Sequence, residues 1–280
     1  MLAVLAILGA GCEARAPAGP VVASRPGASD AVDAPAEAVD PQTIATPLVA
    51  IPAGTFRPLF GKDVGDLPVA AFALERHAVT NGQFLAFVRA EPKWRRSRVK
   101  NLFADAQYLA HWVSDLDHGP DAADQPVTRV SWFAARAYAR WVGRRLPTVA
   151  EWEVAAADLD GGRDAITKLL LKWYSRPTPA VLPAVESTFS TRAGVHDLHG
   201  LVWEWVDDFN SALVSGESRG DAGLERNLFC GSGSVGAADP SDYAAFMRYA
   251  FRSSLRAGYT VQNLGFRCAH DATQVAEAGR

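Results

Sequence analysis

The segment GVHDLHGLVWEWVDDF (194–209) carries the features that decide the fold. Its glycines suit tight turns, and its Trp-Glu-Trp centre places two large aromatic side chains, Trp203 and Trp205, on either side of one acid. Large aromatic residues dominate the burial of apolar surface in protein cores. We therefore predict that these tryptophans fill a core or brace turns, rather than contact a ligand, and expect the same of Trp132, Trp141 and Trp152.

The composition bounds the class of protein. The 280 residues suffice for one large domain or two modest ones. A chain that is 49% hydrophobic, with 8 Trp, 23 Gly and 17 Pro, suits one core wrapped in irregular loops rather than a helical bundle. The net charge of −3 gives no electrostatic basis for a nucleic-acid partner. No segment approaches the roughly 20 consecutive apolar residues that a membrane-spanning helix requires.

Three helices have clear start signals. Thr80 and Thr148 each begin a capping box, and Ser131 can cap a helix that continues through Val142 and ends at Gly143. Residues 166–174 give a weaker helical signal. Before these helices, residues 49–56 read as a short strand interrupted by Pro and Gly, and from residue 194 onward the glycine-rich pattern predicts strands and long loops.

Five stretches together resemble a known family. In order they are PVAAFALERHAVTNGQFLAFV (68–88), QPVTRVSWFAARAYARW (125–141), RLPTVAEWEVAAA (145–157), the segment 194–209 and NLGFRCA (263–269). Their order and spacing are similar to those of the formylglycine-generating enzyme family, also called the sulfatase-modifying factor family. The resemblance implies an α+β domain, the family's variant of the C-type-lectin-like fold, with little regular secondary structure. We place this domain at 46–271, followed by a polar tail at 272–280.

The resemblance does not extend to the residues of the family's oxidase chemistry. Its enzymes oxidise a substrate cysteine with a closely spaced cysteine pair downstream of the Trp-Glu-Trp motif, but residues 231–267 contain no cysteine. The positions of the pair fall near Asp239 and Ala244, neither of which can form a thiolate or a soft copper ligand. Cys230 and Cys268 flank this region, and we predict a structural disulfide between them. A thiol pair for metal or redox work, and two buried free thiols, are the alternatives.

The resemblance also implies a calcium site. In the family an Asn before Val-Trp-Glu-Trp and the Glu help to hold Ca²⁺, and this chain has Leu201 and Glu204 at those positions. Calcium takes several oxygen ligands, and Leu201 offers none from its side chain. Glu204 therefore stands as a candidate calcium ligand, with hydrogen bonding to loop amides as its alternative role. His196 and His199 occupy positions where the family has a loop without metal ligands, which favours turn packing.

The N-terminus predicts export. An apolar run at 2–8 is followed by small residues and Cys12, as in a lipoprotein signal at 1–12 whose cleavage leaves Cys12 lipidated. The alternative is an ordinary apolar start with an incidental cysteine. Residues 13–45 are rich in Ala, Pro, Gly and Asp and lack aromatic residues, which predicts a disordered linker. We expect a bacterial, periplasmic lipoprotein, anchored to the membrane through its N-terminal lipid.

Two functions from different classes follow. The first is a binding or accessory module for maturation of a periplasmic metalloenzyme. Copper is a candidate metal of that partner, since GLVWEW and FCG resemble the subgroup associated with bacterial copper nitrite reductase. The second is a divergent oxidase that uses a metal or Cys230 with Cys268. For the first, we expect a protein or peptide partner to dock along a groove, because Tyr and Arg side chains often dominate binding energy. The predicted docking residues are Tyr243, Phe246, Arg248, Tyr249 and Arg252, of which Arg248 and Arg252 have loop bracing as an alternative.

Overall fold

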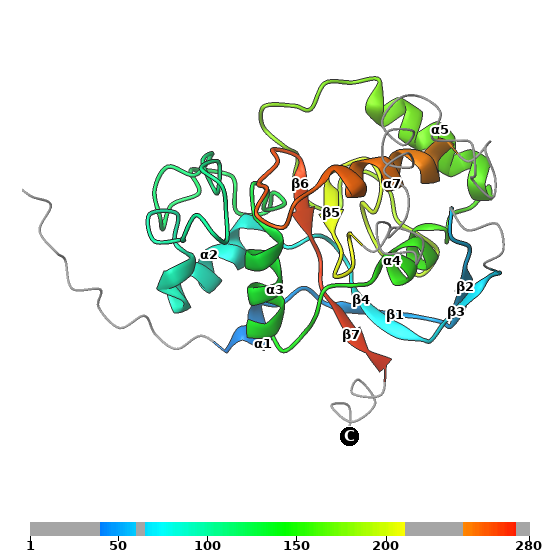
Figure 1. The fold of residues 1–280 in the computed structure, drawn as a ribbon, viewed down its shortest axis with the longest axis horizontal. Coiled ribbons are helices and arrows are strands. Elements are labelled where there is room, and N and C mark those ends of the chain that lie inside the picture. Colours follow the sequence, from blue (N-terminus) through cyan, green and yellow to red (C-terminus); the bar gives the residue numbers. More distant parts are fainter. Residues whose placement is uncertain (1–39, 60–64, 211–242, 273–280) are drawn as a thin grey trace, which may run out of the picture. The chain divides into compact units, whose positions relative to one another are not determined.

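A computed structural model describes residues 40–59, 65–210 and 243–272, all within one unit of the chain, Ala36–Arg280 (Figure 1). Its helices are α1 (Pro41–Ile44), α2 (Asn81–Ala90), the 3₁₀ helix η1 (Pro92–Trp94), α3 (Trp132–Trp141), α4 (Val149–Ala156), α5 (Gly162–Tyr174) and α7 (Tyr243–Ser254). Its strands are β1 (Leu48–Ile51), β2 (Gly54–Phe56), β3 (Leu67–Val69), β4 (Phe72–Glu75), β5 (Trp203–Trp205), β6 (Leu264–Phe266) and β7 (Ala269–Asp271).

The helices predicted from their capping residues are confirmed. The Thr80 hydroxyl accepts from the Gln83 amide at the start of α2, and Thr148 and Glu151 form the second capping box at the start of α4. Ser131 caps α3, and Gly143 follows it with φ +70°, a conformation that suits glycine. Local side-chain hydrogen bonds therefore determine where these helices begin.

Two predictions of local structure need correction. Residues 243–254 form the helix α7, not strands or loops. The pattern was present in the sequence, because Ala244, Arg248 and Arg252 recur at four-residue spacing and all three are buried on one helix face. The helix α1 also lies before the predicted domain start at 46, within the predicted linker, and the Asp40 side chain caps it by accepting from the Gln42 amide.

The strands form one three-stranded sheet and two strand pairs. The sheet has the antiparallel order β1-β4-β7, with Leu48 opposite Glu75 and Phe72 opposite Asp271. Its central strand β4 is buried at every residue. β2 and β3 form an antiparallel hairpin, and β5 pairs in parallel with β6. The last strand, β7, thus lies against β4 from the early part of the domain (Figure 1).

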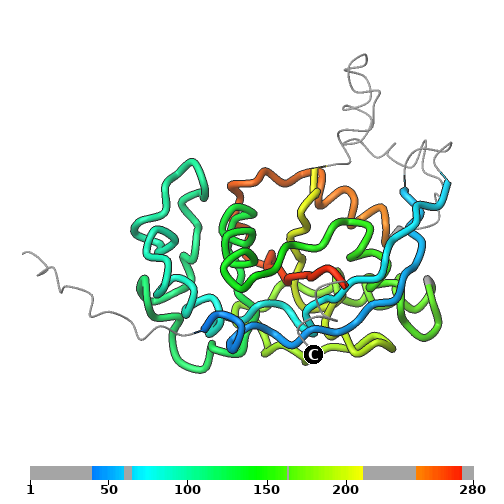
Figure 2. The backbone as a smooth tube through the Cα atoms, turned by 90° about the horizontal axis from the view of Figure 1, so that it is seen from below, coloured from blue at the N-terminus to red at the C-terminus, as the bar shows by residue number. Residues whose placement is uncertain are grey.

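Aromatic side chains fill the core, as predicted. Trp152 and Trp205 are buried, and Trp132, Trp141 and Trp203 pack partly buried against the same cluster. The loops 95–131 lie at the α2 end of the domain, while α5 and the β2–β3 hairpin lie at the other (Figures 1 and 2). Among the described residues, no helix combines the length and apolar character needed to cross a membrane.

Candidate functional site

A buried ion-pair network joins α7 to α4. Glu153 of α4 accepts hydrogen bonds from Arg248 Nη2 at 2.6 Å and from Arg252 Nη1 at 2.7 Å. The two arginines can reach one carboxylate because residues four apart lie on the same face of α7. Burial would raise the pKa of Glu153, but the two guanidinium groups outweigh it and lower the pKa to about 2. Glu153 is therefore a charged partner of α7 at neutral pH.

Trp152 connects this network to the strands. The guanidinium carbons of Arg248 and Arg252 lie 5.9 and 5.0 Å from the centre of its ring. Its indole Nε1 donates to Glu204 Oε2 of β5 at 2.8 Å. Glu204 in turn accepts from Nη2 of Arg267 at 2.8 Å and from its Nε at 2.9 Å. A continuous series of side-chain contacts thus connects α7, through α4, to the β5–β6 strand pair.

The Arg267 partner changes the interpretation of Glu204. Both side chains of this pair are fully buried, and Arg267 also donates to the carbonyl oxygens of Glu75 and His196. A calcium ion at Glu204 would have to share the carboxylate with a buried guanidinium, which repels it. The residues present therefore do not fit the calcium role expected for Glu204. Within residues 40–59, 65–210 and 243–272, no three His, Cys, Asp or Glu side chains form a metal-binding group.

The predicted docking residues differ in how far the structure buries them. Arg248 and Arg252 were expected to face a partner, but their side chains are only 8% and 10% exposed and pair with Glu153. Arg248→Ala should therefore lower stability, because it would remove one of the two guanidinium groups that compensate the Glu153 carboxylate. Phe246 and Tyr249 are partly buried. Tyr243 begins α7, and its side chain lies outside the described part of the structure.

A cluster of aromatic rings, which we call the Trp203 cluster, lies where α5 and α7 meet β5. Phe251 of α7 stacks on Trp203 with ring centroids 4.3 Å apart. On α5, Trp173 and Tyr174 lie 5.3 and 5.5 Å from Trp203. All four rings are partly exposed. Trp203 was predicted as a core residue. The other three rings were not predicted, although Trp173 and Tyr174 lie at the end of the helical signal at 166–174.

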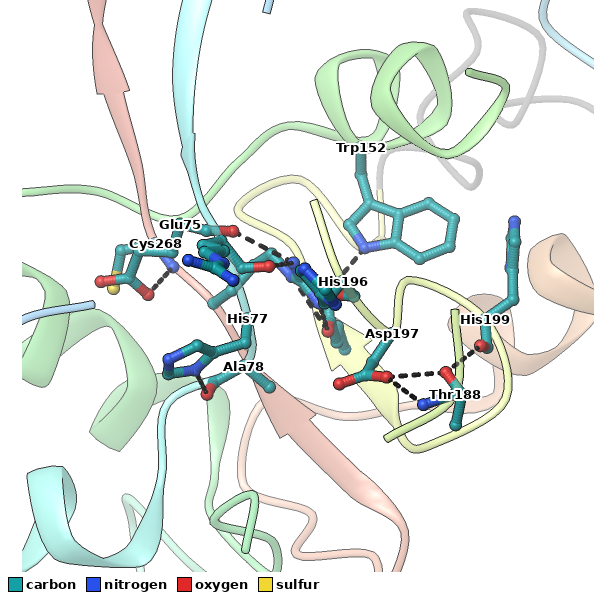
Figure 3. Close-up of polar contacts among 12 residues, drawn as sticks. Glu75, His77, Ala78, Trp152, Thr188, His196, Asp197, His199 and Cys268 are labelled. Carbon is teal, nitrogen blue, oxygen red and sulfur yellow. Dashed lines mark hydrogen bonds and ion pairs between the residues drawn. The ribbon is translucent and has the colours of Figure 1, made fainter. Parts of the chain in front are cut away.

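Cys268 is completely buried, and it has no disulfide partner among the residues that the structure describes. Burial raises its pKa well above the usual range, and the neighbouring Glu75 carboxylate raises it further. Glu75 also accepts from the Cys268 amide at 2.7 Å, as Figure 3 shows. A protonated, buried thiol is a poor nucleophile and a poor metal ligand. Cys230, Cys12 and Asp239 lie outside the described residues, so the predicted disulfide and lipidation stay predictions.

The histidine-rich part of the segment 194–209 forms a packed turn. Asp197, with φ +61°, accepts from the amide and the hydroxyl of Thr188 at 2.8 and 2.7 Å (Figure 3). His199 is buried between Trp152 and Phe189, at ring distances of 5.3 and 6.0 Å. Burial, with Arg248 nearby, lowers its pKa to about 3. A neutral, enclosed ring agrees with the predicted turn packing.

This arrangement can be compared with known proteins. The family model "Sulfatase-modifying factor enzyme 1-like domain" matches residues 35–272. The "Formylglycine-generating enzyme" of Streptomyces coelicolor is 33% identical, over 86% of this chain and 96% of its own length. The "Inactive C-alpha-formylglycine-generating enzyme 2" of Mus musculus is 26% identical, over 82% and 87%. The solved structure of PvdO from Pseudomonas aeruginosa is 19% identical, covers 86% of this chain and 100% of its own, and has a TM-score of 0.47.

The chain therefore belongs to the sulfatase-modifying factor family, which includes the formylglycine-generating enzymes. The match extends over the whole described region, so the family assignment covers the ion-pair network, the Trp203 cluster and the sheet alike.

Proposed function

We propose that this protein is a binding module of the family that has lost the oxidase chemistry and assists a polypeptide partner. The observation that carries the proposal is the absence of cysteine from residues 231–267, where the family has its catalytic pair. Ala244, at one of the corresponding positions, is buried on α7 and offers no nucleophile. The name of the mouse relative marks it as inactive, which supports the view that the family scaffold serves without oxidation.

The surface formed by α7 and the Trp203 cluster is the feature that supports a binding role. The Glu153 network fastens α7 against α4, and the Trp203 cluster presents four partly exposed rings beside it. Aromatic side chains provide large contact areas at a low cost in conformational entropy. We place the docking surface on the outward side of α7, at Phe246 and Tyr249, and at this cluster, instead of at Arg248 and Arg252.

The finer parts of the proposal rest on the sequence. They are a C-type-lectin-like topology, export with lipidation of Cys12, and an accessory role in the maturation of a periplasmic copper enzyme of the nitrite reductase type. The alternative, an oxidase that uses Cys230 with Cys268, has the raised pKa of the buried Cys268 thiol against it.

Two measurements test the function. A Cys-x-Pro-x-Arg peptide incubated with the protein and Cu(I) should keep its mass, while the Streptomyces relative serves as the converting control. Conversion above the level of a Cys230→Ser/Cys268→Ser variant would overturn the loss of oxidase activity. For binding, Phe246→Ala should reduce capture of periplasmic partners at least about tenfold at unchanged melting temperature, as expected for a binding hot spot. Capture equal to that of the unaltered protein would count against this surface.

A further inference from the structure

A small pocket lies at the other end of the domain, among the loops 95–131 beside α2. It has a volume of about 130 Å³ and combines a polar side with an apolar wall. The polar side includes His111, Thr128, Arg129 and Gln262, and the wall includes Pro179 and Leu182. Ligand sites for drug-sized molecules are roughly 300–1,000 Å³, so this pocket admits a small group on a short stem.

The backbone of Arg129 brings the polar side together. Its carbonyl oxygen accepts from the Leu109 amide at 3.0 Å, and its amide donates to the Val261 carbonyl at 3.2 Å. These two bonds bring the segments that carry His111 and Gln262 to Arg129. Arg129 has φ +52°, a left-handed conformation that is uncommon for a residue with a side chain. Such conformations persist where the surrounding contacts hold them, and they concentrate at functional sites.

The pocket carries positive charge without a neutralising acid. Arg129 donates through Nη1 to the neutral Gln107 Oε1 at 3.1 Å, and within the described part of the chain no carboxylate pairs with it. Arg96, whose charge also acts on His111, donates to the carbonyl oxygens of Leu109 and Trp112. Arg129 is thus the cation of the pocket lining, and Arg96 adds its charge at His111; both guanidinium groups donate to uncharged acceptors.

His111 responds to this field. His111 is an exposed residue, but partial desolvation of its ring, followed by the charges of Arg129 and Arg96, lowers its pKa to about 4. At neutral pH the ring is uncharged and offers one N–H donor. Neither the His111 ring nor the Thr128 hydroxyl makes a hydrogen bond to another described residue, although Thr128 is buried. The pocket lining thus combines two side chains that have donors available, His111 and Thr128, with Arg129, which pairs with no carboxylate among the described residues.

We propose that this pocket binds a carboxylate group, from an acidic peptide side chain or from a small free carboxylic acid. The guanidinium of Arg129 provides the charge-assisted hydrogen bond, which is the strong kind. His111, Thr128 and Gln262 offer further donors, and Pro179 and Leu182 contact the carbon stem. The site is separate from the α7 surface and does not depend on the proposed function, since neither the cysteine pair nor a partner enters the argument.

The test follows the His111 ring by NMR in the full chain labelled at histidine. Succinate and a capped Gly-Asp-Gly peptide are titrated at constant ionic strength, with a Gly-Asn-Gly peptide, chloride and inorganic phosphate as comparisons. We expect saturable shifts of the His111 signals with both carboxylates and a rise of its pKa toward 6.5, because an anion reverses the field of the arginines. Tighter binding of the aspartyl peptide than of succinate identifies a peptide as the source, and the reverse identifies a free acid.

Arg129→Gln should weaken carboxylate binding at least about tenfold, since a charge-assisted bond is lost. Arg89→Gln, the same change at an exposed site outside the pocket, should leave it unaltered. Gln262 is exposed, so Gln262→Ala gives a second variant that folds even if Arg129→Gln does not. Absence of a saturable shift, equal binding by the Gly-Asn-Gly peptide, tighter binding of phosphate, or full affinity in both pocket variants would overturn the proposal.

Discussion

The Glu153 network predicts a large effect from a small change. Glu153→Gln keeps the shape of the side chain and removes its charge, so that the buried Arg248 and Arg252 both lose the Glu153 carboxylate. Breaking a buried ion pair by removal of one partner costs about 3–5 kcal/mol, because a buried charge loses its compensation. For a domain of this size that loss lowers the melting temperature by roughly 6–20 °C. The measurement is urea unfolding followed by circular dichroism.

A matched control comes from the surface. Asp66→Asn removes the carboxylate that pairs with Arg57, but these side chains are 43% and 67% exposed. Such exposed pairs contribute at most about 1 kcal/mol. If Glu153→Gln destabilises the protein no more than Asp66→Asn does, the network does not hold α7 in place and the reasoning fails.

The pH dependence provides an independent check of the same carboxylate. Because the pKa of folded Glu153 is about 2, below its ordinary value of 4.5, its contribution to stability is complete above pH 4.5 and is lost as the pH falls toward 2. The Glu153→Gln variant should show a shallower loss of stability across that window. An identical pH profile in both proteins would contradict the low pKa.

Three further predictions follow from buried groups. His199 has a pKa of about 3, below its ordinary 6.5, so stability should fall as the pH drops from 6.5 toward 3, and His199→Gln should flatten that dependence in urea titrations. Gly265→Ala should destabilise the protein by about 1–3 kcal/mol through overpacking, because the added Cβ would lie 2.6 Å from the Val127 carbonyl oxygen. Gly258→Ala, where the added Cβ has open space, should leave stability unchanged. Equal melting temperatures for the two variants would refute this prediction. Cys268 should resist iodoacetamide in the folded protein and react after unfolding under reducing conditions, because it is buried and its pKa is raised. Intact mass measures the alkylation, and a modified Cys268 in the native protein would contradict its burial.

The local elements were predictable because their causes are local. The capping boxes at Thr80 and Thr148 involve residues three positions apart, and both helices begin where the sequence indicates. The helix α7 was missed because its buried face carries arginines, which looks like a polar loop when the partner is unknown. That partner, Glu153, lies 95 positions away from Arg248. The spacing of residues within 243–254 does not identify Glu153 as their partner.

The sequence by itself determined the family, the helix starts, the aromatic core and the absence of cysteine from 231–267, because each depends on residue identity and short-range order. Only the tertiary structure decided what the charged residues do. Glu204 looked like a calcium ligand until Arg267, 63 positions on, was found against it, and the pocket at Arg129 exists only because 111, 129 and 262 meet. Long-range contacts assign the partner of each charge, and in a buried setting the partner determines whether a carboxylate binds a metal, holds a helix or accepts a ligand.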